Sequence, residues 1–190
     1  MKILLATQNR NKVKEIAELL DERFQLLDLN DFPVNEDLPE TGDTFAANAL
    51  QKARYVFDKF GIPTIADDSG IEADALNGAP GIYSARYAGE EKDPEKNMNK
   101  LLNEMAVHSN KTARFRCAMA FISEQGEYVF EGEIEGKIIP ERRGNGGFGY
   151  DPVFIPEGYD LTFSELSSEV KNKISHRAIA MQKLVNFLTH

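Results

Sequence analysis

The chain has 190 residues, with 22 Lys or Arg against 31 Asp or Glu, so its formal net charge is −9. A protein that binds DNA or RNA through phosphates usually displays a basic face, so this balance argues against nucleic acid as the main partner. An anionic ligand must therefore be held by a few well-placed cations or by a metal.

The length fits a single domain, which we expect to span residues 1–190. Cys117 is the only cysteine, which excludes an intrachain disulfide and fits a reducing cytosol, and its apolar neighbours are typical of an inert buried thiol. The apolar run at residues 3–6 is too short for a signal peptide, and no stretch approaches membrane-spanning length. We therefore expect a cytoplasmic protein without a membrane partner.

The first half of the chain alternates predicted strands and helices. A strand over residues 2–6 precedes a helix whose apolar stripe is Val13, Ile16, Ala17 and Leu20, and a second strand follows at 24–29. After a loop over residues 30–42, the spacing of Ala46, Ala49, Leu50 and Ala53 predicts a helix that ends near Gly61. Thr41 or Asp43 is its expected N-cap.

The predicted elements then become shorter and more mixed. A third strand, Thr64 to Ala66, leads directly into Asp67-Asp68-Ser69-Gly70. A helix over 94–107, a hairpin over 113–136 and a strand at 153–155 come next. A final helix places Met181, Leu184, Val185 and Leu188 on one face. The pattern predicts a mixed α/β fold.

The segment Thr7-Gln8-Asn9-Arg10-Asn11-Lys12 lies where the first strand gives way to a helix. A helix start offers unpaired N–H groups and positive potential, so small polar residues with a lysine suit a phosphate. The alternative is an N-cap followed by a solvated lysine.

Three carboxylates form a second candidate group: Glu40, Asp67 and Asp68. The two aspartates follow a strand, where α/β sheets bind ligands, and adjacent carboxylates are unfavourable unless a cation or water joins them. Ligands that are all oxygen suit Mg²⁺. The alternative is an ordinary turn, because Asp-Asp-Ser-Gly is also a turn sequence.

Gly144, Gly146 and Gly149 match the spacing G-x-G-x-x-G, but a dinucleotide fingerprint must follow a strand and open a helix, and this stretch does neither. We therefore expect a flexible loop that presents Phe148 and Tyr150, one of which can stack on a base. The alternative for these aromatic residues is a place in the core.

Lys171, His176 and Arg177 bring three cationic or donor groups within seven residues of an acidic chain. Together with Lys12 and Lys52 they can hold a polyphosphate. The alternative is a solvated basic turn.

Taken together, these segments resemble the inosine triphosphate pyrophosphatase family, in particular its dITP/XTP pyrophosphatases. The resemblance covers essentially the whole chain in order. The segments that carry it are residues 6–12, 40–45 with Asn48 and Lys52, 66–70, 78–89, 147–152, and Lys171 with 175–177.

The resemblance implies Mg²⁺-dependent hydrolysis of ITP, dITP and XTP to the nucleoside monophosphate and pyrophosphate. It implies a homodimer of elongated α/β subunits, each a single domain with a mixed sheet flanked by helices and a central cleft. It also implies a role for each matching residue. Glu40 and Asp68 bind the metal, Asp68 accepts a proton, and the substrate is bound by Thr7, Gln8, Asn9, Arg10, Asn11, Lys12, Lys52, Ser69, Phe148, Gly149, Tyr150, Asp151, Lys171, His176 and Arg177.

Two other functions compete with this interpretation. One is a Maf-like pyrophosphatase acting on modified pyrimidine or methylated nucleotides. The other is a nucleotide- or phosphate-sensing module in which the aspartates only shape a turn. Against the sensor, surplus carboxylates beside bound phosphates repel them unless a metal intervenes.

Overall fold

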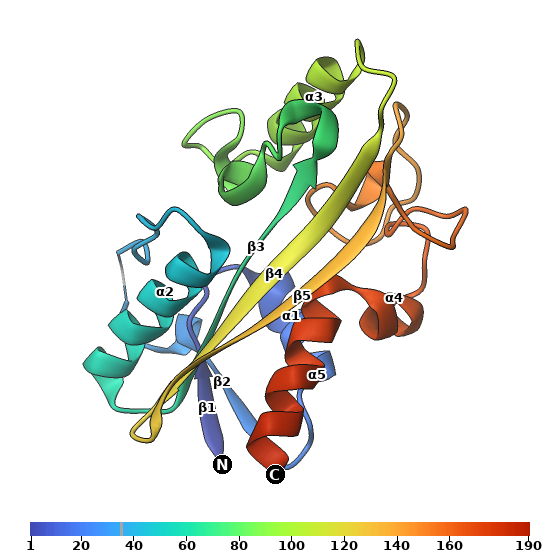
Figure 1. Cartoon of the computed structure of the whole chain (residues 1–190). Coiled ribbons are helices and arrows are strands. Elements are labelled where there is room, and N and C mark those ends of the chain that lie inside the picture. Colours follow the sequence, from blue (N-terminus) through green and yellow to red (C-terminus); the bar gives the residue numbers. More distant parts are fainter. Residues whose placement is uncertain (35) are drawn as a thin grey trace. The chain divides into compact units, whose positions relative to one another are not determined.

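The computed structural model describes residues 1–34 and 36–190 (Figure 1). The chain forms two compact units. The first contains Met1–Asp68, Cys117–Gly132 and Arg177–His190, and the second contains Ser69–Arg116 and Glu133–His176.

Six strands form one mixed sheet. They are β1 (Lys2–Leu5), β2 (Gln25–Asp28), β3 (Thr64–Ala73), β4 (Thr112–Ser123), β5 (Gly126–Ile138) and β6 (Phe154–Pro156). Their order across the sheet is β2-β1-β3-β4-β5-β6. Strand β1 pairs in parallel with β2 and β3, whereas β5 and β6 are antiparallel. The predicted α/β fold with a mixed sheet is confirmed.

In the part of the chain that the structure describes, five α-helices flank the sheet: α1 (Arg10–Leu19), α2 (Phe45–Phe60), α3 (Pro94–Met105), α4 (Ser168–Ile174) and α5 (His176–Thr189). Short 3₁₀ helices occur at Leu29–Asp31, Asp74–Leu76, Gly81–Arg86 and Asp151–Val153. Among the described residues, every helix is too short or too polar to cross a membrane.

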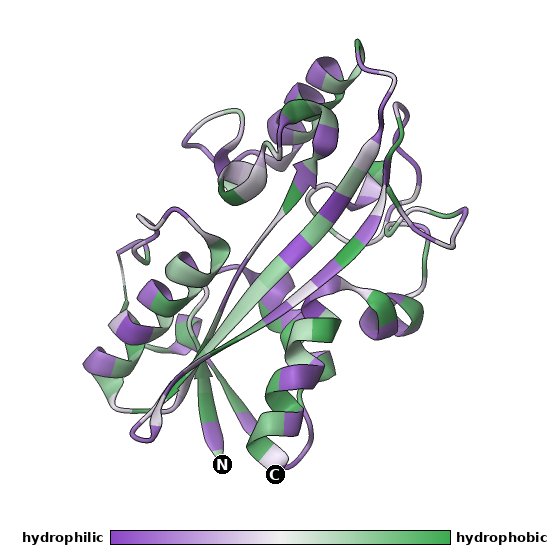
Figure 2. Ribbon diagram, viewed as in Figure 1, coloured by the Kyte–Doolittle hydropathy of each residue, from purple (hydrophilic) through white to green (hydrophobic). Residues whose placement is uncertain are grey.

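The core of the first unit lies between strands and the helices α1 and α5. Strand β1 contributes Ile3 and Leu5, α1 contributes Ile16, and α5 contributes Met181 and Leu184. Figure 2 shows the apolar run of β1 and the mixture of polar and apolar residues along α2. Such a mixture is expected of a helix that buries one face. Cys117 lies in this core, as predicted.

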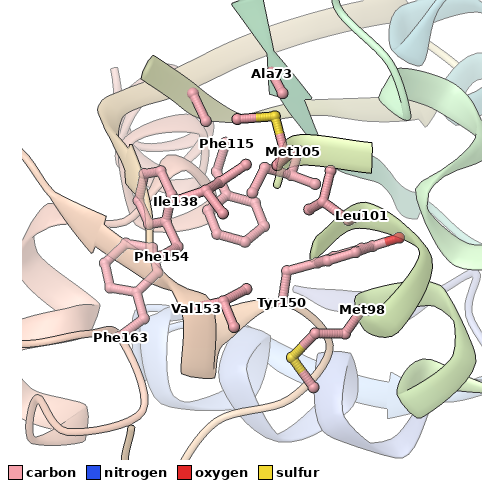
Figure 3. Close-up of a cluster of buried hydrophobic side chains, with 12 residues drawn as sticks. Ala73, Met98, Leu101, Met105, Phe115, Ile138, Tyr150, Val153, Phe154 and Phe163 are labelled. Carbon is pink, nitrogen blue, oxygen red and sulfur yellow. The ribbon is translucent and has the colours of Figure 1, made fainter. Parts of the chain in front are cut away.

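The second unit has a separate core rich in aromatic rings (Figure 3). The Phe115 ring meets the Phe154 ring edge to face, with 4.7 Å between centroids, and lies near that of Phe163 at 5.8 Å. Leu101 and Met105 of α3 complete the cluster. Both geometries are favourable for aromatic pairs, so the ring cluster fixes the relative placement of β4 and the segment around β6.

Helix α2 begins later than either predicted N-cap allows. The Thr44 hydroxyl accepts a hydrogen bond from the Ala47 N–H at 3.0 Å, which makes Thr44 the N-cap. Thr41 is instead engaged by Gln51 of the same helix, through bonds of 2.8 and 2.9 Å. The predicted end is confirmed, because Gly61 follows the helix in a left-handed conformation with φ of 63°.

Strand β3 is longer than predicted, because it continues through Asp67-Asp68-Ser69-Gly70 to Ala73. The turn interpretation of that segment is therefore wrong, and so is the expectation that the aspartates follow the strand. A strand tolerates Asp67 at a fully buried position because Lys12 and Arg177 supply opposite charge there.

Candidate active site

The segment between β1 and α1 is built as a helix start. The Asn9 side chain accepts hydrogen bonds from the N–H groups of Asn11 and Lys12, at 3.0 and 3.4 Å, and is the N-cap of α1. The Thr7 hydroxyl in turn accepts the Asn9 N–H at 3.2 Å. The segment therefore contains an N-cap, as its alternative interpretation expects, and the capping residue is Asn9.

The remaining residues of this segment differ in exposure. Gln8, Asn9, Arg10 and Asn11 are exposed, and Gln8 donates to the Glu36 carbonyl at 3.3 Å. Lys12 is not the solvated lysine of the capping interpretation. Its side chain is only 15% exposed, and its ammonium lies 3.0 Å from an Asp67 carboxylate oxygen.

Asp67 is the centre of a buried charge cluster in the first unit. The same oxygen that Lys12 approaches accepts two bonds from the Arg177 guanidinium, at 3.1 and 3.3 Å, and Arg177 also pairs with Glu15 of α1. Burial opposes the ionisation of Asp67. The charges of Lys12, Arg177 and Lys52 outweigh burial, so the pKa of Asp67 lies below its ordinary value.

Asp68, the next residue, has different partners. Its carboxylate accepts a hydrogen bond from the Asn48 amide at 3.1 Å, and Lys52 lies 3.5 Å from its other oxygen. Burial raises the pKa of Asp68 above its ordinary value, and the charge of Glu40 acts in the same direction, against the opposing effect of Lys52 and Lys12. A carboxylate with a raised pKa is a better proton acceptor than an ordinary one.

Glu40 lies in the loop before helix α2, and a lysine of that helix links it to Asp68. The Asn48 side chain accepts the Gly42 N–H at 2.8 Å while donating to Asp68, so a single amide ties the preceding loop to β3. The Lys52 ammonium then contacts both Glu40 and Asp68. Burial would lower the pKa of Lys52, but the charges of Asp68, Glu40 and Asp67 raise it.

The donor set at this place fits a hard divalent cation. Glu40 and Asp68 both reach one buried ammonium, so their oxygens converge on a common centre of positive charge. Magnesium is commonly held by one or two carboxylates together with substrate phosphates. Groups of three or more acidic, histidine or cysteine side chains that would enclose a metal are absent from residues 1–34 and 36–190.

The second unit holds the other predicted residues around Asp151. This buried carboxylate accepts the Phe148 N–H at 2.9 Å and the Lys171 ammonium at 2.6 Å. The same ammonium lies 5.4 Å from the centroid of the Phe148 ring. Gly147 has φ of 69°, and a Cβ there would lie 2.1 Å from an Asp151 oxygen, so glycine is required for this close approach.

Tyr150 and His176 belong to the core of the second unit rather than to its surface. Figure 3 places Tyr150 within the buried cluster, and its hydroxyl donates to the Ser84 carbonyl at 2.7 Å. The His176 ring stacks on Phe115 with 4.8 Å between centroids. Of the other predicted residues, Ser69 and Gly149 are half-buried.

The basic segment near the C-terminus is also buried. Lys171, His176 and Arg177 are each less than one-tenth exposed, so the solvated-turn interpretation is wrong. Lys171 lies within α4, a helix that the sequence analysis did not predict. The chain passes from the second unit to the first at the peptide bond between His176 and Arg177.

Sequence reasoning did not assign a site role to Asn48 or Glu15. Asn48 precedes Lys52 by four residues, and Glu15 follows Lys12 by three. Both spacings place two side chains on one face of a helix. That spacing is the signal by which these two residues can be found from sequence.

A pocket of about 310 Å³ lies elsewhere in the second unit, beside the C-terminal turns of α3 and residues 138–140. Its lining contains none of the predicted site residues.

Comparison with known proteins agrees with the resemblance seen in the sequence. A sequence model of the Ham1 family matches residues 3–187. A protein of Flavobacterium johnsoniae named dITP/XTP pyrophosphatase is 47% identical over 189 residues, covering 100% of this chain and 98% of the relative. A protein of the same name from Bacillus subtilis is 48% identical over 190 residues, covering 97% and 96%.

Solved structures give the same result. The Ham1 protein of Staphylococcus aureus superposes with a TM-score of 0.89 at 38% identity, over 100% of this chain and 98% of that one. A HAM1 protein of Coxiella burnetii gives the same TM-score at 40% identity and the same coverage. With a family match over nearly its full length, the chain belongs to the Ham1 family.

Proposed function

We propose that this protein hydrolyses non-standard purine nucleoside triphosphates, namely ITP, dITP and XTP, to the monophosphate and pyrophosphate. One observation carries the proposal. Asp68 lies beside Lys52, which also contacts Glu40, while its neighbour Asp67 is neutralised by Lys12 and Arg177. The names of the full-length relatives support the same substrates.

Glu40 and Asp68 would hold Mg²⁺, since their oxygens converge and oxygen donors suit that ion. When bound there, the metal would neutralise charge on the phosphate oxygens as pyrophosphate leaves.

The chain's own residues provide the rest of the chemistry. The side chains of the segment from Thr7 to Lys12, together with Lys52, bind the phosphates. Asp68 orients a water molecule and accepts its proton. The water oxygen then bonds to the α-phosphorus as the bond from that phosphorus to the bridging oxygen breaks, and pyrophosphate departs.

The group around Asp151 in the second unit binds the base. The Phe148 ring stacks on the purine, which adds affinity without distinguishing among purines. Hypoxanthine and xanthine present an oxygen at C6, where adenine presents an amino group. A buried donor such as Lys171, or a backbone N–H of this loop, is satisfied by that oxygen and is left unpaired by adenine, which discriminates strongly.

The proposal includes the finer features that the resemblance implies. Residues 1–190 act as one catalytic domain, the protein is a cytoplasmic homodimer, and Arg177 supports the substrate site through Asp67. The central cleft and elongated outline stay predictions. Light scattering coupled to size exclusion measures the dimer, which a mass near 21.3 kDa would contradict.

The position of water attack is a direct test of the chemistry. Hydrolysis of ITP in H₂¹⁸O with Mg²⁺ is expected to place one ¹⁸O in inosine monophosphate and none in pyrophosphate. Chelation of the metal is expected to stop the reaction, and added Mg²⁺ to restore it. Label in pyrophosphate, or release of single orthophosphate, would contradict attack at the α-phosphorus.

A further inference from the structure

Lys52 is a buried cation placed on the two carboxylates assigned to the metal. It is 5% exposed, and its ammonium contacts Glu40 and lies 3.5 Å from Asp68. A buried ammonium is unfavourable unless opposite charge surrounds it, so these two contacts are what retain it there. Lys52 therefore occupies the two carboxylates, Glu40 and Asp68, that we propose as ligands of the metal.

The neighbouring cations are engaged elsewhere within the first unit. Lys12 lies 3.0 Å from Asp67, and Arg177 bridges Asp67 and Glu15. Lys52 is therefore the cation whose contacts, as the structure describes them, join Glu40 to Asp68. A divalent cation on the same two carboxylates would be held close to this ammonium, and like charges in a buried site repel strongly.

The surrounding contacts allow Lys52 to move while the carboxylates stay in place. Asn48 donates to Asp68 at 3.1 Å and accepts the Gly42 N–H at 2.8 Å, and Gln51 bonds to Thr41, so Asp68 and the backbone that follows Glu40 have contacts besides the lysine. A lysine has a flexible four-carbon stem and three donors, which allows it to exchange a carboxylate for a phosphate oxygen.

We propose that Lys52 is an internal counter-cation, which keeps Glu40 and Asp68 closed to divalent metal until a triphosphate provides the lysine with new partners. The metal and the nucleotide then bind together rather than metal first. This inference rests on the proposed function for the identity of the metal carboxylates. It assigns to Lys52 a role in the free enzyme as well as in substrate binding.

Metal binding without nucleotide tests the inference. Titration of Mn²⁺ into the nucleotide-free protein, followed by electron paramagnetic resonance of free Mn²⁺, measures affinity without turnover. Removing the charge in Lys52→Gln is expected to tighten Mn²⁺ binding at least about tenfold relative to the unaltered protein, because the competing cation is gone. Adding Glu40→Gln to Lys52→Gln is expected to abolish that gain.

Two control variants separate charge from disruption of the helix. Lys59→Gln removes an exposed lysine of the same helix, which pairs with Glu36 at 2.9 Å, and is expected to leave Mn²⁺ binding unchanged. Lys52→Arg keeps the charge and is expected to bind Mn²⁺ as weakly as the unaltered protein. Circular dichroism shows whether each variant is folded.

The inference is overturned if folded Lys52→Gln binds Mn²⁺ no tighter than the unaltered protein. It is also overturned, whatever the variants do, if the unaltered nucleotide-free protein binds one Mn²⁺ with a dissociation constant below about 10 μM, since closed carboxylates exclude tight binding. Because no nucleotide is present, these outcomes are independent of substrate preference. A failure of the proposed function would instead appear as a wrong product or a wrong base.

Discussion

Two adjacent aspartates of β3 have opposite surroundings. Successive side chains of a strand point to opposite faces, so Asp67 and Asp68 meet different neighbours although they are consecutive. Asp67 lies with Lys12 and Arg177, and its pKa is lowered, whereas Asp68 accepts from Asn48 and its pKa is raised. The first arrangement is that of a structural ion pair, and the second suits the proton acceptor that we propose.

For Asp67→Asn we expect a less stable protein. The substitution removes the negative charge that the buried Arg177 and the half-buried Lys12 share, and breaking a buried pair in this way costs about 3–5 kcal/mol. Urea unfolding followed by circular dichroism measures the change. A loss below about 1 kcal/mol, the range of surface ion pairs, would contradict the structural role.

For Asp68→Asn we expect a loss of turnover rather than a loss of stability. Glu40 remains beside the buried Lys52 in this variant, so the protein is expected to stay folded at neutral pH. Turnover of ITP is expected to fall by about 10²-fold or more, since the proton acceptor is lost. Asp58→Asn on α2, at an exposed position, is the matched control. Near-normal turnover of Asp68→Asn would remove it from the catalytic role.

The single cysteine gives a pH-dependent prediction. Burial, with the charge of Asp67 acting in the same direction, raises the pKa of Cys117 to about 12. The unfolded chain loses this proton at lower pH than the folded chain, so the contribution of Cys117 to stability falls as the pH rises above about 9. At pH 8 a disulfide reagent should leave the folded protein unmodified and label one thiol in guanidinium. Rapid labelling of the folded protein would contradict this.

At the scale of elements, the glycine-rich loop around residues 144–149 is held by hydrogen bonds, so the expectation of a flexible loop is wrong. The Ser164 hydroxyl donates to the Gly146 carbonyl at 2.6 Å, and the Gly146 N–H donates to the Ser164 carbonyl at 3.1 Å. The Thr162 hydroxyl donates to the Arg143 carbonyl at 2.8 Å. These bonds hold the loop that presents Phe148, so a base would meet a ring already in position.

For Ser164→Ala we expect weaker substrate binding with little change in turnover. Loss of this bond frees the loop, so the KM for ITP is expected to rise by about tenfold while kcat stays within about twofold. The chain has no tryptophan, so Phe148→Trp introduces a single tryptophan, and titrating ITP against its fluorescence measures binding separately from turnover. Ser123→Ala, at the end of β4, is the control. An unchanged KM would contradict the positioning role.

The periodicity of the sequence predicted most elements, because apolar spacing reflects burial of one face. Periodicity does not predict the bounds of an element where a contact between residues distant in sequence decides them. The strand containing Asp67 was ended too early, since its partner Arg177 is 110 positions away. The N-cap of α2 was misplaced because Thr41 bonds to Gln51 instead. The short helix Ser168–Ile174 was not predicted at all.

The candidate site shows the same limit. Residue types and motif resemblance predicted Glu40, Asp68 and Lys52, which the fold brings together. They gave no role to Asp67, because its role depends on the three-dimensional position of Lys12 and Arg177.

At the scale of the whole molecule, the net charge of −9 gives the few buried cations their importance. Lys12, Lys52 and Arg177 in the first unit and Lys171 in the second are each paired with a carboxylate. The acidic balance of the chain repels a triphosphate, so we expect its affinity to depend on local positive charge. The family match over residues 3–187 includes all of them.

The central claim is selective hydrolysis of non-standard purine triphosphates. The most direct measurement is pyrophosphate release with Mg²⁺ from ITP, dITP and XTP beside ATP, dATP, GTP and dGTP, expressed as kcat/KM. We predict values at least about 100-fold higher for the first three, because a donor facing C6 is left unpaired by adenine and guanine is rejected at C2. Equal values for all purines, or preference for a pyrimidine substrate, would contradict the account.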